Sequence, residues 1–137
     1  MYRSIMVPVD LEHAQALHKA LGTAAGLARQ FGATVTYVAV SSSAPGAVAH
    51  NPEEFAGRLA AFASDEGRRF GIETSSLACI SHDPTADLDR TLLKAAEELL
   101  ADLIVMASHV PGVAEHIFAS HAGYVASHAE TSVFVVR

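Results

Sequence analysis

The chain has 137 residues, half of them hydrophobic, and carries a formal net charge of −6. This length fits one compact domain over residues 1–137, and the negative charge repels nucleic acid and anionic membrane surfaces, so neither is an expected partner. The opening apolar run SIMVPV is too short for a membrane span and has no signal cleavage site, and Cys79 is the single cysteine, so we expect a cytoplasmic protein without an internal disulfide.

The first part of the chain alternates apolar strands with an amphipathic helix. Residues 4–9 and 34–40 are apolar on consecutive positions and rich in β-branched side chains, which is typical of strands buried on both faces of a parallel sheet. Between them, apolar side chains recur every three or four positions over residues 14–31, and Gly32 supplies a helix stop. The following loop, residues 41–52, is rich in Ser, Pro and Gly, and is interpreted either as a flexible connector or as a lid over a ligand.

Two further helices are predicted over residues 51–71 and 83–99. Each begins with a capping Asn or Asp directly before a proline at the first helical position, and each carries apolar side chains on one face. A fourth helix is predicted from about Ser120 to Ser127. The remaining predicted strands are 76–80, which has the weakest pattern, 102–106 and 132–136.

This regular alternation of strands and helices predicts an α/β fold. We expect a single-domain, doubly wound, five-stranded parallel sheet in the order 3-2-1-4-5 with helices on both faces, because parallel neighbours need crossovers that are nearly always right-handed. Ligands of such sheets bind outside the carboxyl ends of the strands, where the strand order reverses. The reversal is expected between the first strand, which ends in VPVD, and the fourth, which ends in VMASH.

Asp10 stands at the tip of the first strand. A carboxylate there can accept hydrogen bonds from ribose hydroxyls or an adenine amino group, and an equally weighted alternative is a cap for the next helix. The chain lacks the dinucleotide fingerprint, a Walker loop and a nucleophile elbow, and Cys79 lies in a predicted buried strand. No catalytic residue is therefore predicted, and a slow ATPase that uses His109 and Asp10 is the weaker alternative.

Three segments together resemble the universal stress protein family, and the similarity covers nearly the full length. YRSIMVPVD resembles the opening strand of that family, DLIVMASH its fourth strand, and SHAETSVFVVR its closing turn and strand. The start ASHVP after the fourth strand is closest to the small single-domain UspF/UspG type. The resemblance implies a stress-response protein with an ATP site in many members, and a homodimer joined through the last strand, with the seam at Val133, Phe134 and Val135.

In that family the ATP site carries the signature G-x2-G-x8/9-G-[ST] after the fourth strand. Carried onto this chain, its positions are Ala107, Val110, Ala119 and Ser120, so only the final hydroxyl residue matches. By the same analogy, adenine and ribose meet Pro8, Val9, Asp10 and Val40. The opposite wall and the phosphate contacts fall to Met106, Ser108, His109, Ser120 and His121.

The chain has no lysine or arginine between Lys94 and Arg137. Losing two or three charge-assisted hydrogen bonds, at about 1.5–3 kcal/mol each, lowers triphosphate affinity by several orders of magnitude. We therefore expect a degenerate adenine-nucleotide pocket that holds adenosine or AMP more readily than ATP, with Mg²⁺ only alongside ATP. The expected role is ligand- or dimer-dependent signalling, and the alternative is an interaction protein of the same fold that binds no nucleotide.

The eight histidines suggest a metal site at first sight. Four of them crowd the last quarter of the chain, but no pair is spaced to share one helical face closely, and no Cys or Glu completes a ligand cluster. No metal site is expected from this pattern.

Overall fold

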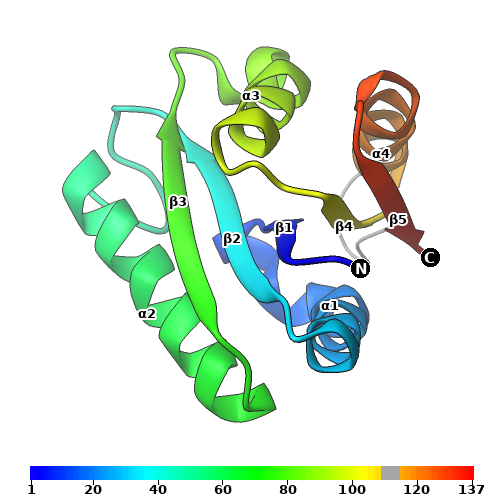
Figure 1. Ribbon diagram of the computed structural model, residues 1–137. Coiled ribbons are helices and arrows are strands. Elements are labelled where there is room, and N and C mark those ends of the chain that lie inside the picture. Colours follow the sequence, from blue (N-terminus) through cyan, green and yellow to red (C-terminus); the bar gives the residue numbers. More distant parts are fainter. Residues whose placement is uncertain (109–114) are drawn as a thin grey trace.

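The computed structural model describes residues 1–108 and 115–137, with the backbone alone described for residues 115–120. Five strands form one parallel sheet in the order β3-β2-β1-β4-β5 (Figure 1). The strands are β1 (Ser4–Pro8), β2 (Thr34–Ser41), β3 (Thr74–Ile80), β4 (Leu103–Ala107) and β5 (Ser132–Val136). The predicted fold class and strand order are thus confirmed, and the strand with the weakest pattern, β3, begins earlier than expected.

Two helices cover each face of the sheet (Figure 1). One apolar cluster joins the sheet to α1 (His18–Phe31) and α2 (Pro52–Phe70), and a second joins it to α3 (Pro84–Glu98) and α4 (Glu115–His128). Both faces are buried, which explains the runs of consecutive apolar residues in the strands. Among the described residues, no helix has the length and apolar character needed to cross a membrane.

The first helical segment differs from its prediction. Residues 11–17 form a 3-10 helix, η1 (Leu11–Leu17), and the α-helix begins only at His18. The cause is local, because His13 has the non-helical angles φ −121° and ψ 27° and bonds back to the capping residue Asp10. The end of α1 matches the prediction, since Gly32 adopts the left-handed conformation with φ 66° that a helix stop requires.

The caps of α2 and α3 form as the sequence predicts. The side chains of Asn51 and Asp83 accept hydrogen bonds from the backbone N–H groups of Glu54 and Ala86, at 2.8 and 3.2 Å. α4 begins at Glu115, before the predicted start.

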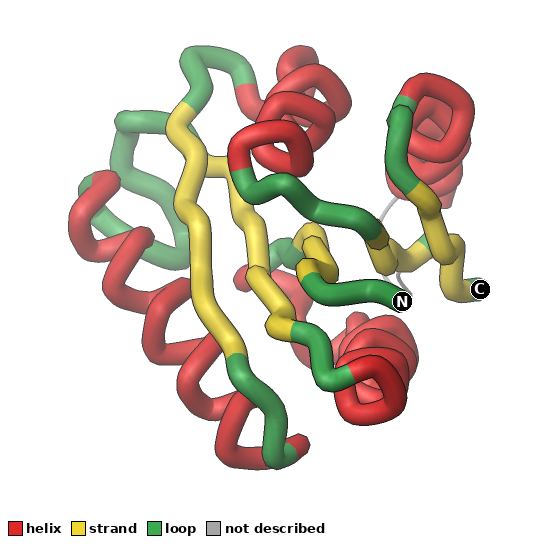
Figure 2. The backbone as a smooth tube through the Cα atoms, in the orientation of Figure 1, coloured by secondary structure: helices red, strands yellow, loops and turns green. Residues whose placement is uncertain are grey.

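The pairing of the central strand β1 with its neighbour β4 is short. β1 pairs with β4 at two positions only, Ile5 with Leu103 and Met6 with Ile104, whereas its pairing with β2 continues as far as Pro8 and Val38. Figure 2 shows that the loops after β2 and β3 leave the sheet at the same, carboxyl end. The reversal of strand order therefore coincides with a gap in strand pairing, which is where this architecture binds ligands.

Candidate functional site

A cavity of about 430 Å³ lies at the carboxyl ends of β1, β2 and β4. Six of the predicted site residues are among its described lining residues: Pro8, Val9, Asp10, Val40, Met106 and His121. The tips of the first and fourth strands thus contribute to one cavity, together with a side chain from α4. Its volume falls within the range of small-molecule sites, about 300–1,000 Å³.

Asp10 serves as the cap of η1. Its Oδ1 accepts a hydrogen bond from the backbone N–H of Glu12 at 3.1 Å, and its Oδ2 lies 2.8 Å from Nδ1 of His13. The helix-cap alternative is therefore observed. A carboxylate has about four acceptor positions, so Asp10 keeps capacity to accept a hydrogen bond from a ligand in the cavity that it lines.

The loop after β2 forms one wall of the cavity. Its inner part, residues 46–49, closes a turn in which the N–H of Gly46 donates to the carbonyl of Ala49 at 2.9 Å. Ala49 is buried and Val48 packs against the core, so this part of the loop is anchored rather than freely solvated.

The wall opposite β2 comes from α3 and α4. The first turns of α3 contribute Thr85 and Leu88, and His121 of α4 is held by Asp89, with 2.5 Å between Nδ1 and Oδ1. Both side chains are largely buried, at 13% and 24% exposure for His121 and Asp89. A polar contact between two helices therefore fixes an imidazole at the cavity.

Other predicted site residues lie outside the cavity lining or outside the described residues. Ala107 packs against the core cluster beneath α1, and the backbone N–H of Ser108 donates to the carbonyl of Val136 at 2.8 Å, which extends the pairing of β4 with β5. His109 and Val110 lie outside the described residues. Ala119 and Ser120 belong to α4 by their backbone, and their side chains are not described.

The contribution of α3 to the cavity was not predicted from the sequence, whereas a lid over a ligand was one of the two interpretations given to the loop after β2. A signal existed for α3, since DPTADL begins a helix directly after a strand, which places its first turns at the carboxyl end of the sheet. The particular residues of that loop that line the cavity were not predicted, because the turn over Gly46 to Ala49 follows from tertiary packing.

The cavity is electrostatically poor in cations. No lysine or arginine stands among its described lining residues, while Asp10 and Glu12 contribute two carboxylates. His121 is the one described lining residue that can carry a positive charge.

Asp10, Glu12 and His13 come close enough together to hold a metal ion, with one ligand atom of each within 4.8 Å of the others. Asp10 and Glu12 line the same cavity as His121, one of the histidines of the last quarter, but His121 is not one of the three residues of this group. Both oxygens of Asp10 already accept hydrogen bonds within η1, and the hydrogen bond to Asp10 raises the pKa of His13. Helix capping accounts for this cluster without a metal ion.

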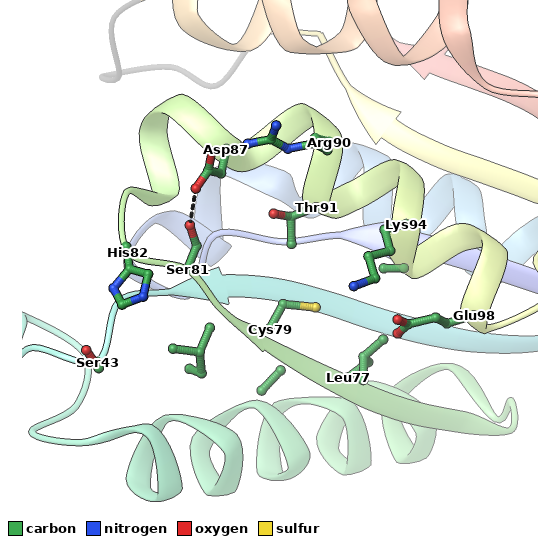
Figure 3. Close-up of a pocket in the computed structure, with 13 residues that line it drawn as sticks. Ser43, Leu77, Cys79, Ser81, His82, Asp87, Arg90, Thr91, Lys94 and Glu98 are labelled. Atoms are coloured by element: carbon green, nitrogen blue, oxygen red, sulfur yellow. Dashed lines mark hydrogen bonds and ion pairs between the residues drawn. The ribbon is translucent and has the colours of Figure 1, made fainter.

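A second cavity, of about 660 Å³, lies between β3 and α3 (Figure 3). There the Ser81 hydroxyl donates to Asp87 at 2.8 Å, and Arg90 pairs with the same carboxylate at 2.5 Å. Cys79 faces this cavity beside Lys94, and burial raises the pKa of its thiol, which keeps it protonated and weakly nucleophilic. This cavity therefore contains no activated nucleophile among its described residues.

The sequence model of the Universal stress protein family matches residues 1–137. Universal stress protein G of Salmonella typhimurium is 28% identical, with both chains covered over 100% of their length. The solved universal stress protein of Archaeoglobus fulgidus in complex with dAMP is 25% identical, with 99% of this chain and 98% of that chain covered and a TM-score of 0.67. A solved universal stress protein in complex with cAMP has a TM-score of 0.73 at 17% identity, covering 99% of this chain and 97% of the other.

Proposed function

Because the chain belongs to the universal stress protein family, we propose that the cavity at the carboxyl ends of β1 and β4 binds adenosine or an adenosine monophosphate. The observation that carries the proposal is the position of this cavity, where the strand order reverses and the pairing of β1 with β4 ends. A similar protein of known structure, from Archaeoglobus fulgidus, holds dAMP.

The lining suits a purine nucleoside. Apolar side chains, among them Val9, Val40 and Met106, offer flat contact to a base, and Asp10 supplies an acceptor for ribose hydroxyls. Small-molecule sites are usually lined by many apolar side chains and a few polar groups, as this cavity is.

The charge of the lining favours a ligand with few phosphates. Two carboxylates and a single histidine face the cavity, and none of its described lining residues is lysine or arginine. Each additional phosphate adds negative charge without adding a partner, so the affinity for ATP falls below that for AMP unless Mg²⁺ neutralises the triphosphate. The degenerate phosphate loop in the sequence points the same way.

The protein acts as a stress-response module whose output depends on the ligand or on a dimer. β5 is an edge strand that pairs with β4, and its other edge has no partner among the described strands. Phe134 is 45% exposed there, between the half-buried Val133 and Val135. Pairing with a second copy would cover this edge, which proteins rarely leave open.

Calorimetric titration with adenosine, AMP and ATP with and without Mg²⁺ tests the binding proposal. We expect AMP and adenosine to bind more tightly than ATP. Thr85→Trp places an indole at the rim of the cavity and should weaken AMP binding at least tenfold, whereas Ala86→Trp, on the adjacent position outside the lining, should not. Absence of any binding would favour the interaction protein that holds no nucleotide, and phosphate release from ATP would favour the slow ATPase.

A further inference from the structure

The contact between Asp89 and His121 joins residues that are 32 positions apart in sequence. Asp89 lies in α3 and His121 in α4, and 2.5 Å separates Oδ1 of the aspartate from Nδ1 of the imidazole. With 24% and 13% of their side chains exposed, the two groups form a partly desolvated pair rather than a surface contact.

The pair fixes the state of the imidazole ring. An ionised carboxylate can only accept hydrogen bonds, so Nδ1 of His121 carries the proton and donates it to Asp89. Nε2 has no hydrogen-bond partner in the described part of the chain, and the ring lines the cavity. The carboxylate therefore orients the ring, while the second nitrogen stays available to a ligand.

The other charged groups among the described residues at the cavity are acidic. Asp10 and Glu12 face it from the region of η1, β4 contributes the uncharged Met106, and Asp89 supports His121 from α3. Only in its imidazolium form does His121 also donate from Nε2, and the described lining offers an anion no lysine or arginine beside it.

We infer that the Asp89–His121 pair recognises the phosphate of a bound adenosine monophosphate, with the imidazolium form of His121 donating from Nε2 and Asp89 acting as the positioning residue. This inference rests on the proposed function and deepens it, because it states that His121 contacts the phosphate of the ligand rather than its base. One donor serves one phosphate, so the site selects a monophosphate over the free nucleoside, and gains little from further phosphates.

Calorimetric titration at pH 7 with AMP and with adenosine separates the two claims. His121→Gln should weaken AMP binding about 10- to 100-fold, the range of one lost charge-assisted hydrogen bond, and leave adenosine binding within about twofold. Asp89→Asn keeps an acceptor for Nδ1 but removes the charge, so a smaller loss, about 3- to 10-fold, is expected for AMP alone. His128→Gln is the matched control, since His128 lies in the same helix and outside the cavity.

Equal losses for AMP and adenosine in the His121 variant would overturn the inference, because the ring would then only pack against the ligand. The same conclusion follows if the wild-type protein binds AMP no more tightly than adenosine. If neither ligand binds the wild type, the proposed function falls as well. Imidazole nitrogen NMR of the wild type provides a test that needs no variant: the Nε2 signal of His121 should shift on addition of AMP and not of adenosine, and no difference between the two would contradict the inference.

Discussion

Replacement of Leu100 by glycine should stabilise the protein. Leu100 follows α3 in the left-handed conformation with φ 52°, and its side chain is 84% exposed. The N–H groups of Leu100 and Ala101 donate to the carbonyls of Glu97 and Ala96, the two hydrogen bonds of a Schellman motif, which fixes this conformation. This left-handed conformation is sterically strained for leucine, which has a Cβ, but not for glycine.

The magnitude follows from two opposing effects. The left-handed conformation destabilises the folded state by about 1–2 kcal/mol when the residue has a Cβ. Glycine removes this strain, but the larger conformational entropy of its unfolded chain offsets about 0.4–1 kcal/mol of the gain. Little burial is lost, because the leucine side chain is largely in solvent. The expected gain for Leu100→Gly is therefore about 0.5–1 kcal/mol in the free energy of unfolding, or a few degrees in Tm.

Urea denaturation followed by circular dichroism measures this gain. Leu100→Ala is the control, since alanine keeps the Cβ and its strain and should be no more stable than the wild type. AMP binding should stay unchanged, because Leu100 lies at the end of α3 remote from the cavity-lining first turns. A Leu100→Gly variant equal to or less stable than the wild type would refute the reasoning and indicate that the leucine side chain makes a stabilising contact.

Three further predictions concern stability and assembly. Burial raises the pKa of Glu66, whose Oε2 has no hydrogen-bond partner in the described part of the chain, so Glu66→Gln should be about 1 kcal/mol more stable at pH 7. The folded state binds this proton more tightly than the unfolded state, so the advantage should shrink as the pH falls through the folded pKa, and a pH-independent difference in denaturation would contradict it. Asn51→Ala removes the cap of α2 and should cost about 1 kcal/mol in the same assay, with no loss if water replaces the cap. Phe134→Lys places a charge on the exposed face of β5 and should convert a dimer into a monomer in light scattering; a wild type that is already monomeric would rule out the proposed seam.

Local patterns predicted most of the architecture. Consecutive apolar residues marked the buried strands, and Asn51 and Asp83 before proline marked the starts of α2 and α3, because both signals depend on neighbouring positions. The 3-10 helix η1 was missed, since it depends on a bond between Asp10 and the ring of His13 that no propensity describes.

The candidate site was predictable only in part, for a topological reason. Parallel strands bring their carboxyl ends to one edge, so Asp10 and Met106 could be placed together from the sequence. The pairing of Asp89 with His121 could not, because it joins two helices over a long separation and depends on how they pack. His121 was thus predicted as a phosphate contact from the sequence, whereas its pairing with Asp89 required the tertiary structure.

A crystal structure of the protein with AMP tests the central claim most directly. We predict the adenine ring in the cavity between Val40 and Met106, the ribose beside Asp10, and the phosphate within hydrogen-bond distance of Nε2 of His121. AMP bound elsewhere, or a cavity that stays closed by its own side chains at saturating AMP, would contradict the account.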